Sequence, residues 1–201
     1  MRIEIVVFDG FDEIDAFGPF EVLSSAGLDV AFVALEPGDV VSMRGVTMRI
    51  PASLGRPDGV VVPGGGWLNR APEGSWAQAQ RGVLPARLAE IAPSARWLAA
   101  VCTGSLLLAS AGLLADRYAT TNRNAFDELG PHVLDVIGER VVDDGDRVTA
   151  GGLTAGLDLA LRLVERELGS AAADRVADSI EYRRQGRVWF APPRLGRAVP
   201  G

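Results

Sequence analysis

Short apolar runs rich in β-branched residues alternate with helical stretches along most of this 201-residue chain. The runs at residues 3–8, 28–35 and 59–63 predict buried strands. Strands that are apolar on both faces are typical of a parallel sheet covered by helices on both sides. The pattern therefore predicts an α/β fold, a three-layer sandwich whose mostly parallel sheet has a few antiparallel additions.

The remaining elements follow from turn residues and periodicity. We expect a loop at 9–15 and then a helix opened by Pro19, followed by a hairpin of 40–43 with 46–50. A helix is expected over 75–92, interrupted by Pro85, and further helices over 104–114, 125–129, 154–168 and 171–183. Strands are expected at 96–101 and 118–121, and a strand pair at 136–142 and 147–150. Residues 1–185 are predicted to form a single domain. Residues 186–201, rich in Pro, Arg and Gly, are predicted to form an irregular C-terminal tail.

Composition and charge argue against several classes of protein. The net charge of −6 and pI of about 4.9 disfavour a nucleic-acid partner. One cysteine forms no internal disulfide, and residues 1–5 lack the pattern of a signal peptide, so we expect a cytoplasmic location. The uncharged run 97–115 has the length of a membrane span, but the segment 102–105 interrupts it. A buried strand followed by a buried helix explains this run better, and no membrane partner is expected.

Cys102, the only cysteine, lies where an apolar strand turns sharply into a helix. Small residues follow it at Thr103 and Gly104, as a tight turn requires. A thiol at this junction lies beside unpaired backbone N–H groups and the positive end of a helix dipole, and both favour the thiolate. We therefore expect a nucleophile. The alternative is a buried cysteine that acts only as a small hydrophobe.

Three segments directly follow predicted strands: the loop at 9–15, the glycines at 64–66, and Cys102. Ligands of such sheets bind beyond the carboxyl ends of the strands, so we expect these segments to converge on one site. Asp15 has apolar neighbours, and partial burial would raise its pKa and let it donate or relay a proton. The alternative is a helix-capping role. Other acids in this region are weaker candidates, namely Asp9, Asp12, Glu13 and Glu21.

The glycines Gly64, Gly65 and Gly66 can expose backbone N–H groups to a developing negative charge. They lack the spacings of nucleotide-binding loops, so no nucleotide is expected. His132, the only histidine, follows Gly130-Pro131 and is predicted to lie on a surface loop. One cysteine and one histidine do not form a zinc site, and no metal or other cofactor is expected.

Several stretches of the chain resemble the ThiJ/PfpI superfamily, in the family's order. These stretches are residues 14–22, 62–65, 100–105, 111–114, 119–121 and 151–156, within a similarity that spans residues 2–183. The resemblance implies a flavodoxin-like sandwich, a homodimer and a nucleophilic elbow cysteine. Peptidase-like members carry a histidine directly after the cysteine, and Thr103 stands there in this chain. The Cys-Thr-Gly elbow is similar to that of the isonitrile hydratase branch and of the ligand-binding domains of AraC-type regulators.

The hydratase branch implies roles for particular residues. Cys102 would be the nucleophile, Asp15 the catalytic acid and Thr103 a helper hydroxyl, with no cofactor. Substrate would lie against the backbone of three glycines, Gly65, Gly66 and Gly152. The expected reaction is hydration of a small-molecule isonitrile to an N-substituted formamide.

One difference concerns the pocket wall, because relatives often carry a histidine after the Ala-Thr-Thr run, where this chain has Asn122-Arg123. Two alternative functions stay open. One is a glyoxalase or deglycase-type thiol enzyme, and the other is a non-enzymatic domain that senses a ligand or oxidation of Cys102.

Overall fold

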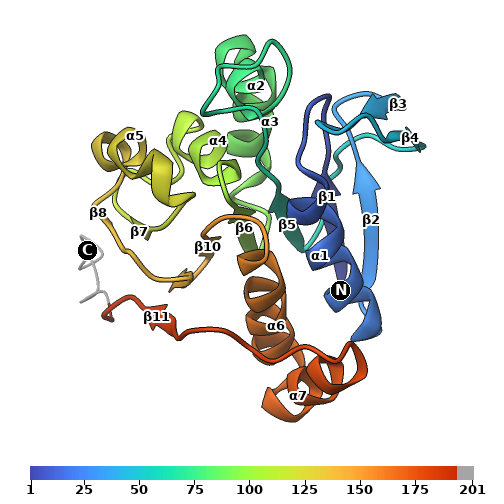
Figure 1. Ribbon diagram of the computed structural model, residues 1–201, viewed down its shortest axis with the longest axis vertical. Helices are drawn as coiled ribbons and strands as arrows, with labels where there is room; N and C mark the ends of the chain where they lie inside the picture. Colours follow the sequence, from blue (N-terminus) through green and yellow to red (C-terminus); the bar gives the residue numbers. More distant parts are fainter. Residues whose placement is uncertain (194–201) are drawn as a thin grey trace, which may run out of the picture.

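A seven-stranded sheet lies between two layers of helices in the computed structural model, which describes residues 1–193 (Figure 1). The strand order is β11-β9-β10-β6-β5-β1-β2. The strands are β1 (Arg2–Val6), β2 (Asp29–Val33), β5 (Gly59–Val62), β6 (Trp97–Val101), β9 (Val141–Asp144), β10 (Arg147–Ala150) and β11 (Val188–Phe190). Strands β2, β1, β5, β6 and β10 are parallel, and β9 is antiparallel to β10. The predicted α/β fold with a mostly parallel sheet is confirmed.

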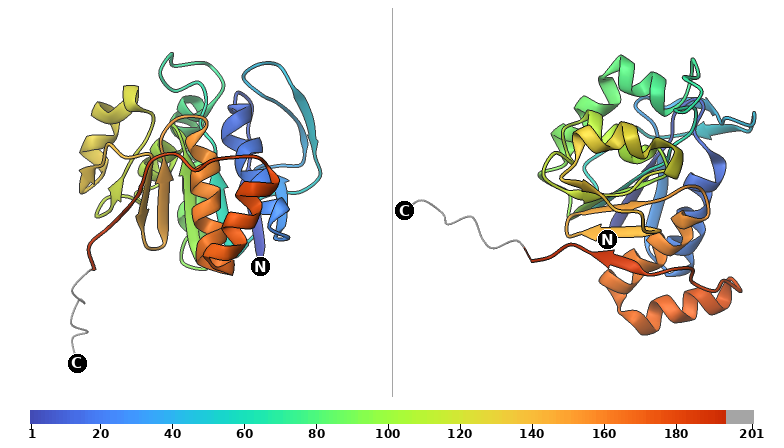
Figure 2. Two further views of the ribbon diagram at one scale, coloured as in Figure 1. Left: turned by 60° about the horizontal axis from the view of Figure 1, so that its bottom comes forward. Right: turned by 60° about the vertical axis from the view of Figure 1, so that its left-hand side comes forward.

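The helices form two groups on opposite faces of the sheet (Figure 2). One group contains α1 (Glu13–Ser25), α6 (Ala155–Leu168) and α7 (Ser170–Ser179), and the other contains α2 (Ser75–Arg81), α3 (Val83–Ile91) and α4 (Gly104–Ser110). The chain leaves β1 in one direction to reach β2 and leaves β5 in the other to reach β6. Because crossovers between parallel strands are right-handed, this reversal places α1 and α3 on opposite faces.

The central strands supply the core. Every residue of β5 and β6 is buried, which explains why both strands are apolar without alternation. The Trp97 ring lies directly over Gly59, where an added Cβ would come within 2.4 Å of it. A buried aromatic of this size is therefore accommodated by the absence of a side chain on the neighbouring strand.

Smaller elements lie outside the main sheet. A predicted hairpin is confirmed as β3 (Gly38–Val41) paired with β4 (Thr47–Ile50). A second small sheet joins β7 (Tyr118–Ala119) to β8 (Asp135–Val136), and between them lie η1 (Arg123–Ala125), α5 (Phe126–Leu129) and η2 (Gly130–His132). In the part of the chain that the structure describes, no helix combines the length and apolar character needed to cross a bilayer.

The start of α1 differs from the prediction. The helix begins at Glu13, six residues before Pro19, because the Asp12 side chain accepts a hydrogen bond from the Ile14 N–H at 3.0 Å and caps it. Asp15 therefore lies in the first turn of a helix and not in a loop. The turn orients its side chain toward the end of β5.

Two further predictions are corrected by the structure. The helix expected over 75–92 is divided at Gly82, which has a φ of 73°, whereas Pro85 lies in the first turn of α3. The segment predicted to be an irregular tail contains β11, which pairs with β9 and extends the sheet beyond residue 185. Residues 194–201 of that segment lie outside the described residues.

Candidate active site

Cys102 occupies a strained turn between β6 and α4. Its φ of 55° lies in the left-handed region that residues other than glycine seldom adopt. Its N–H donates to the carbonyls of Ala150 and Gly151, both at 3.0 Å. Its carbonyl accepts from the hydroxyls of Ser105 and Thr121, both at 2.9 Å. These contacts from separate segments hold the backbone in the conformation that the sharp turn requires.

Gly104 allows the elbow to pack closely on the loop after β5. A Cβ at Gly104 would lie 2.1 Å from the Val62 carbonyl oxygen and 2.8 Å from that of Pro63. Both obstructing atoms belong to backbone, which cannot rotate away. The small residue after Cys102-Thr103 is therefore a steric requirement of this turn.

We expect Gly104→Ala to destabilise the protein by about 3 kcal/mol, because overpacking against fixed backbone costs of this order. The urea midpoint, read by circular dichroism, measures the change. Gly130→Ala is the matched control, since a Cβ there would meet nothing within 4 Å. Equal midpoints for the two variants would show that the elbow has room for a side chain.

Asp15 is fully buried next to the elbow. Its Oδ2 accepts a hydrogen bond from the Gly64 N–H at 3.0 Å. Its Oδ1 has no hydrogen-bond partner of good geometry within residues 1–193, and the carboxyl interacts with the Cys102 thiol and the Leu153 N–H. Burial, and next the negative charge of Asp12, raise the pKa of Asp15 well above its usual range. This environment favours the protonated carboxyl, as the sequence predicted from its apolar neighbours.

The Cys102 thiol is also stabilised in its protonated form. Burial, reinforced by the Asp15 carboxyl, raises the pKa of Cys102 to about 12. The Asn122 side-chain amide, 3.5 Å from Sγ, and the N–H groups of Thr103 and Leu153 act in the opposite direction but do not compensate. The expectation that this junction favours the thiolate is therefore wrong. A helix dipole contributes about 0.3–1 kcal/mol, less than one pKa unit, whereas burial shifts a pKa by up to about 3–5 units.

Alkylation by iodoacetamide provides a direct test of this protonation state. We expect the rate to rise about tenfold per pH unit beyond the usual thiol pKa of 9.0, without a plateau below about pH 11. Because Cys102 is the only cysteine, intact-protein mass spectrometry follows it without ambiguity. A plateau at or below pH 9 would show that the elbow stabilises the thiolate after all.

The structure places Thr103 and Gly65 differently from the expectation. Thr103 Oγ1 accepts the Gly65 N–H at 3.1 Å and lies 3.0 Å from the Ser75 hydroxyl. Ser75 in turn donates to the Gly65 carbonyl at 2.7 Å. This buried network engages the Thr103 hydroxyl and the Gly65 amide together. Neither is directed at the sulfur, and the part of Thr103 that faces it is the backbone N–H.

The other two predicted glycines differ in position. Gly66 shapes the following loop, where its carbonyl accepts from the Ala71 N–H at 3.0 Å. Gly152 lies beside the reactive group, since a Cβ there would be 4.0 Å from Cys102 Sγ and 3.0 Å from the Asn122 amide nitrogen. The next residue, Leu153, directs its N–H toward both the thiol and the Asp15 carboxyl. The Leu153 amide is not among the site groups predicted from the sequence, although the Gly-Gly-Leu run at residues 151–153 could have indicated it.

The remaining candidates lie away from the sulfur. Glu21 is exposed and accepts a hydrogen bond from the Ser25 hydroxyl, and Asp9 accepts one from the Val41 N–H. Asp12 caps α1. Glu13 accepts hydrogen bonds from Ser42 and Arg44 of the hairpin segment. His132 is exposed in η2, as predicted. Within residues 1–193 no cluster of His, Cys, Asp or Glu has the arrangement of a metal site.

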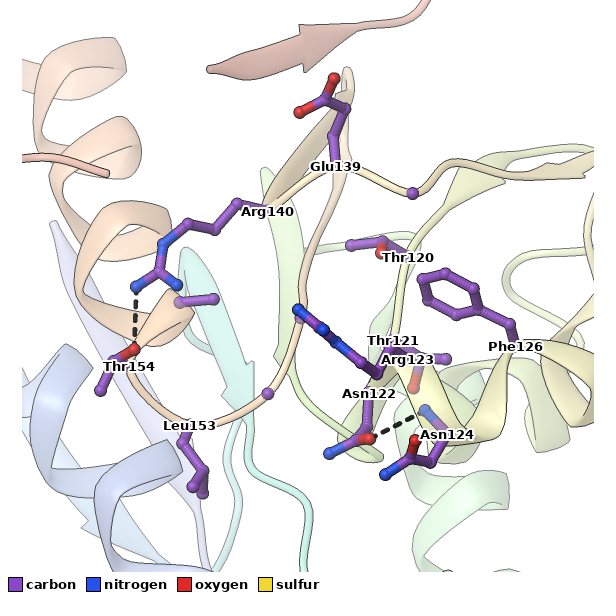
Figure 3. Close-up of a pocket in the computed structure, with 14 residues that line it drawn as sticks. Thr120, Thr121, Asn122, Arg123, Asn124, Phe126, Glu139, Arg140, Leu153 and Thr154 are labelled. Carbon is purple, nitrogen blue, oxygen red and sulfur yellow. Dashed lines mark hydrogen bonds between the residues drawn. The ribbon is translucent and has the colours of Figure 1, made fainter. Parts of the chain in front are cut away.

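A cavity of about 820 Å³ opens beside the elbow (Figure 3). Its walls are residues 120–124, 126, 138–140 and 151–155. Asn122 and Gly152, which flank the sulfur, belong to these walls. Cys102 itself is only 7% exposed, so a small molecule in this cavity would approach the sulfur between these two residues.

The parallel sheet and the strained turn at its carboxyl end define a flavodoxin-like α/β protein with a buried elbow cysteine. The chain belongs to the DJ-1/PfpI family, whose model matches residues 1–166. The resemblance noted from the sequence is therefore confirmed.

Individual relatives carry several names. The chain is 32% identical to the isonitrile hydratase of Pseudomonas putida over 187 residues, which cover 90% of this chain and 78% of the relative. It is 27% identical to a deglycase of Pyrococcus abyssi over 159 residues, covering 75% and 89% of the two chains. The solved structure of a ThiJ/PfpI family protein from Pseudomonas syringae superposes with a TM-score of 0.83 at 29% identity, covering 98% of this chain and 78% of that one. The family thus includes both hydratases and deglycases.

Proposed function

We propose that this protein hydrates an isonitrile to an N-substituted formamide, with Cys102 as nucleophile and Asp15 as proton relay. The observation that carries the proposal is the buried Asp15 carboxyl, which interacts with the Cys102 thiol and whose Oδ1 has no hydrogen-bond partner of good geometry within residues 1–193. Similarity to an isonitrile hydratase over 90% of the chain supports it.

The first step joins sulfur to the substrate. The terminal carbon of an isonitrile holds a lone pair and also accepts a nucleophile. The Cys102 sulfur forms a bond to this carbon, and the thiol proton passes through the Asp15 carboxyl to the carbon lone pair. The product is a thioimidate, R–N=CH–S–Cys102. Asp15 ends the step with the proton count with which it began.

The second step consumes water. Water adds to the thioimidate carbon, with Asp15 taking a proton from the water and passing a proton to the nitrogen. The carbon–sulfur bond then breaks as the C=O bond forms, the sulfur regains its proton, and the formamide R–NH–CHO leaves. One water is added and nothing is oxidised or reduced. Covalent catalysis thus divides the hydration into two steps that the side chains can perform.

The protonated thiol suits this reaction better than it suits oxidation sensing. Peroxide reacts with the thiolate, and a pKa of about 12 keeps Cys102 in the thiol form at neutral pH. Addition to an isonitrile needs a proton and a sulfur nucleophile at the same carbon. The pair of Cys102 and Asp15 supplies both without prior ionisation.

The test is turnover of a simple alkyl isonitrile, followed by NMR through the formyl proton of the formamide. We expect formation well above the buffer rate, and intact-protein mass spectrometry of quenched reactions should show an adduct equal to the mass of the isonitrile. Absence of formamide across a series of alkyl isonitriles would overturn the proposal. Production of lactate from methylglyoxal without isonitrile turnover would instead assign the glyoxalase-type alternative.

A further inference from the structure

Arg123 is an uncompensated cation in the wall of the cavity. It is exposed, and its guanidinium points into the pocket from η1 (Figure 3). No carboxylate within residues 1–193 forms an ion pair with it. It follows Asn122, which stands directly after the Ala-Thr-Thr run at 119–121.

The other charged side chains of the cavity wall do not neutralise Arg123. Arg140 is already engaged, donating to Asp158 at 2.5 Å, to the Thr154 hydroxyl at 2.9 Å and to the Tyr182 hydroxyl at 3.3 Å. The Glu139 carboxylate points away from Arg123 (Figure 3). The free positive charge in the cavity therefore belongs to Arg123.

A buried hydroxyl adds a second, independent observation. Thr120 lines the same cavity and is 0% exposed, yet its Oγ1 has no hydrogen-bond partner within the described residues. A buried hydroxyl without a partner is unfavourable, and a ligand oxygen that accepts a hydrogen bond from it would remove this cost. The N-terminal end of α6 also borders the cavity and contributes a positive dipole end.

The wall of this cavity includes Asn122 and Gly152, which flank the reactive sulfur. The Asn122 amide lies 3.5 Å from Cys102 Sγ, and Arg123 is its neighbour in the chain. A substrate with its reactive carbon at the sulfur would therefore extend its tail past Asn122 toward Arg123.

We infer that the cavity selects isonitriles whose tail carries a carboxylate, which Arg123 and the Thr120 hydroxyl bind. This inference rests on the proposed hydration at Cys102 for the reactive end of the ligand. The guanidinium fork matches the two oxygens of a carboxylate, and such charge-assisted pairs are stronger than neutral hydrogen bonds.

The test compares isocyanoacetate with its neutral methyl ester. We expect the ratio of their kcat/KM values to fall by about 10- to 100-fold in Arg123→Gln relative to wild type, the range typical of a charged hydrogen-bonded pair. Comparing ratios cancels the different intrinsic reactivities of the two isonitriles. Arg175→Gln removes the same charge from an exposed position of α7, which does not line the cavity, and should keep the wild-type ratio.

A binding measurement separates this inference from the proposed function. N-formylglycine, the hydration product of isocyanoacetate, is titrated by NMR against its methyl ester, which requires no turnover. Weaker binding of N-formylglycine to Arg123→Gln, with the ester unaffected, supports the anion site even if no isonitrile is hydrated. Turnover of both isonitriles at a ratio that Arg123→Gln leaves unchanged would overturn the site and leave the hydratase proposal standing.

Discussion

Cys102→Ala is expected to abolish isonitrile hydration, with a fall in kcat of at least about 10⁴-fold, as removal of a covalent nucleophile does in other enzymes. Without the sulfur no thioimidate forms, and Asp15 alone offers no route to the terminal carbon. Stopped assays of formamide over hours, compared with the buffer rate, measure the loss.

Stability should change little in this variant. The elbow is held by backbone and hydroxyl contacts that alanine keeps, and the strained φ of 55° burdens alanine as it does cysteine. Thermal unfolding followed by circular dichroism is the control for folding. A folded Cys102→Ala protein that retains more than about 1% of the wild-type rate would exclude a covalent role for the thiol.

Asp15→Asn is expected to lower kcat by about 10²- to 10⁴-fold, the usual contribution of a proton-transferring group. Asparagine preserves the shape of the side chain but cannot carry the proton from sulfur to carbon. The same change should lower the pKa of Cys102, because the Asp15 carboxyl raises it in the wild type. The alkylation profile with iodoacetamide should then move to lower pH.

The two readouts in Asp15→Asn oppose each other, which makes the test decisive. A thiol that ionises more easily but turns over more slowly identifies the proton relay as the lost function. Glu21→Gln, on the exposed side of the same helix, should keep the wild-type rate. Hydration by Asp15→Asn within threefold of wild type would remove Asp15 from the mechanism.

Much of the fold could be predicted because local patterns and tertiary structure agree in the central strands. Residues 59–62 and 97–101 carry no polar side chain, and these two segments form the buried strands β5 and β6. The helix boundary within residues 75–92 was predicted wrongly because two local signals for a break lie close together there. Pro85 looked like a break but fits the first turn of a helix, whereas Gly82 supplied the left-handed turn. β11 could not be expected, since its pairing with β9 is a long-range contact.

The site was predictable in position and less so in chemistry. Convergence of chain segments at the carboxyl ends of parallel strands correctly placed Asp15 near Cys102. The charge state of the thiol could not be predicted in the same way. The local elbow favours the thiolate, and only the packed structure shows that burial has the larger effect on the pKa of Cys102. The same limit applies to the Gly65 amide, which a distant hydroxyl, that of Thr103, already engages.

The left-handed turn at Cys102 depends on acceptors that the chain reaches almost fifty residues later, at Ala150 and Gly151. A nascent polypeptide that has emerged only through β7 contains both the sulfur and its acid, yet lacks the strand that fixes the turn. The turn at Cys102 is therefore completed late along the chain. It closes only when β10 docks beside β6, so during synthesis the sulfur reaches its final geometry after β10 has been added to the chain.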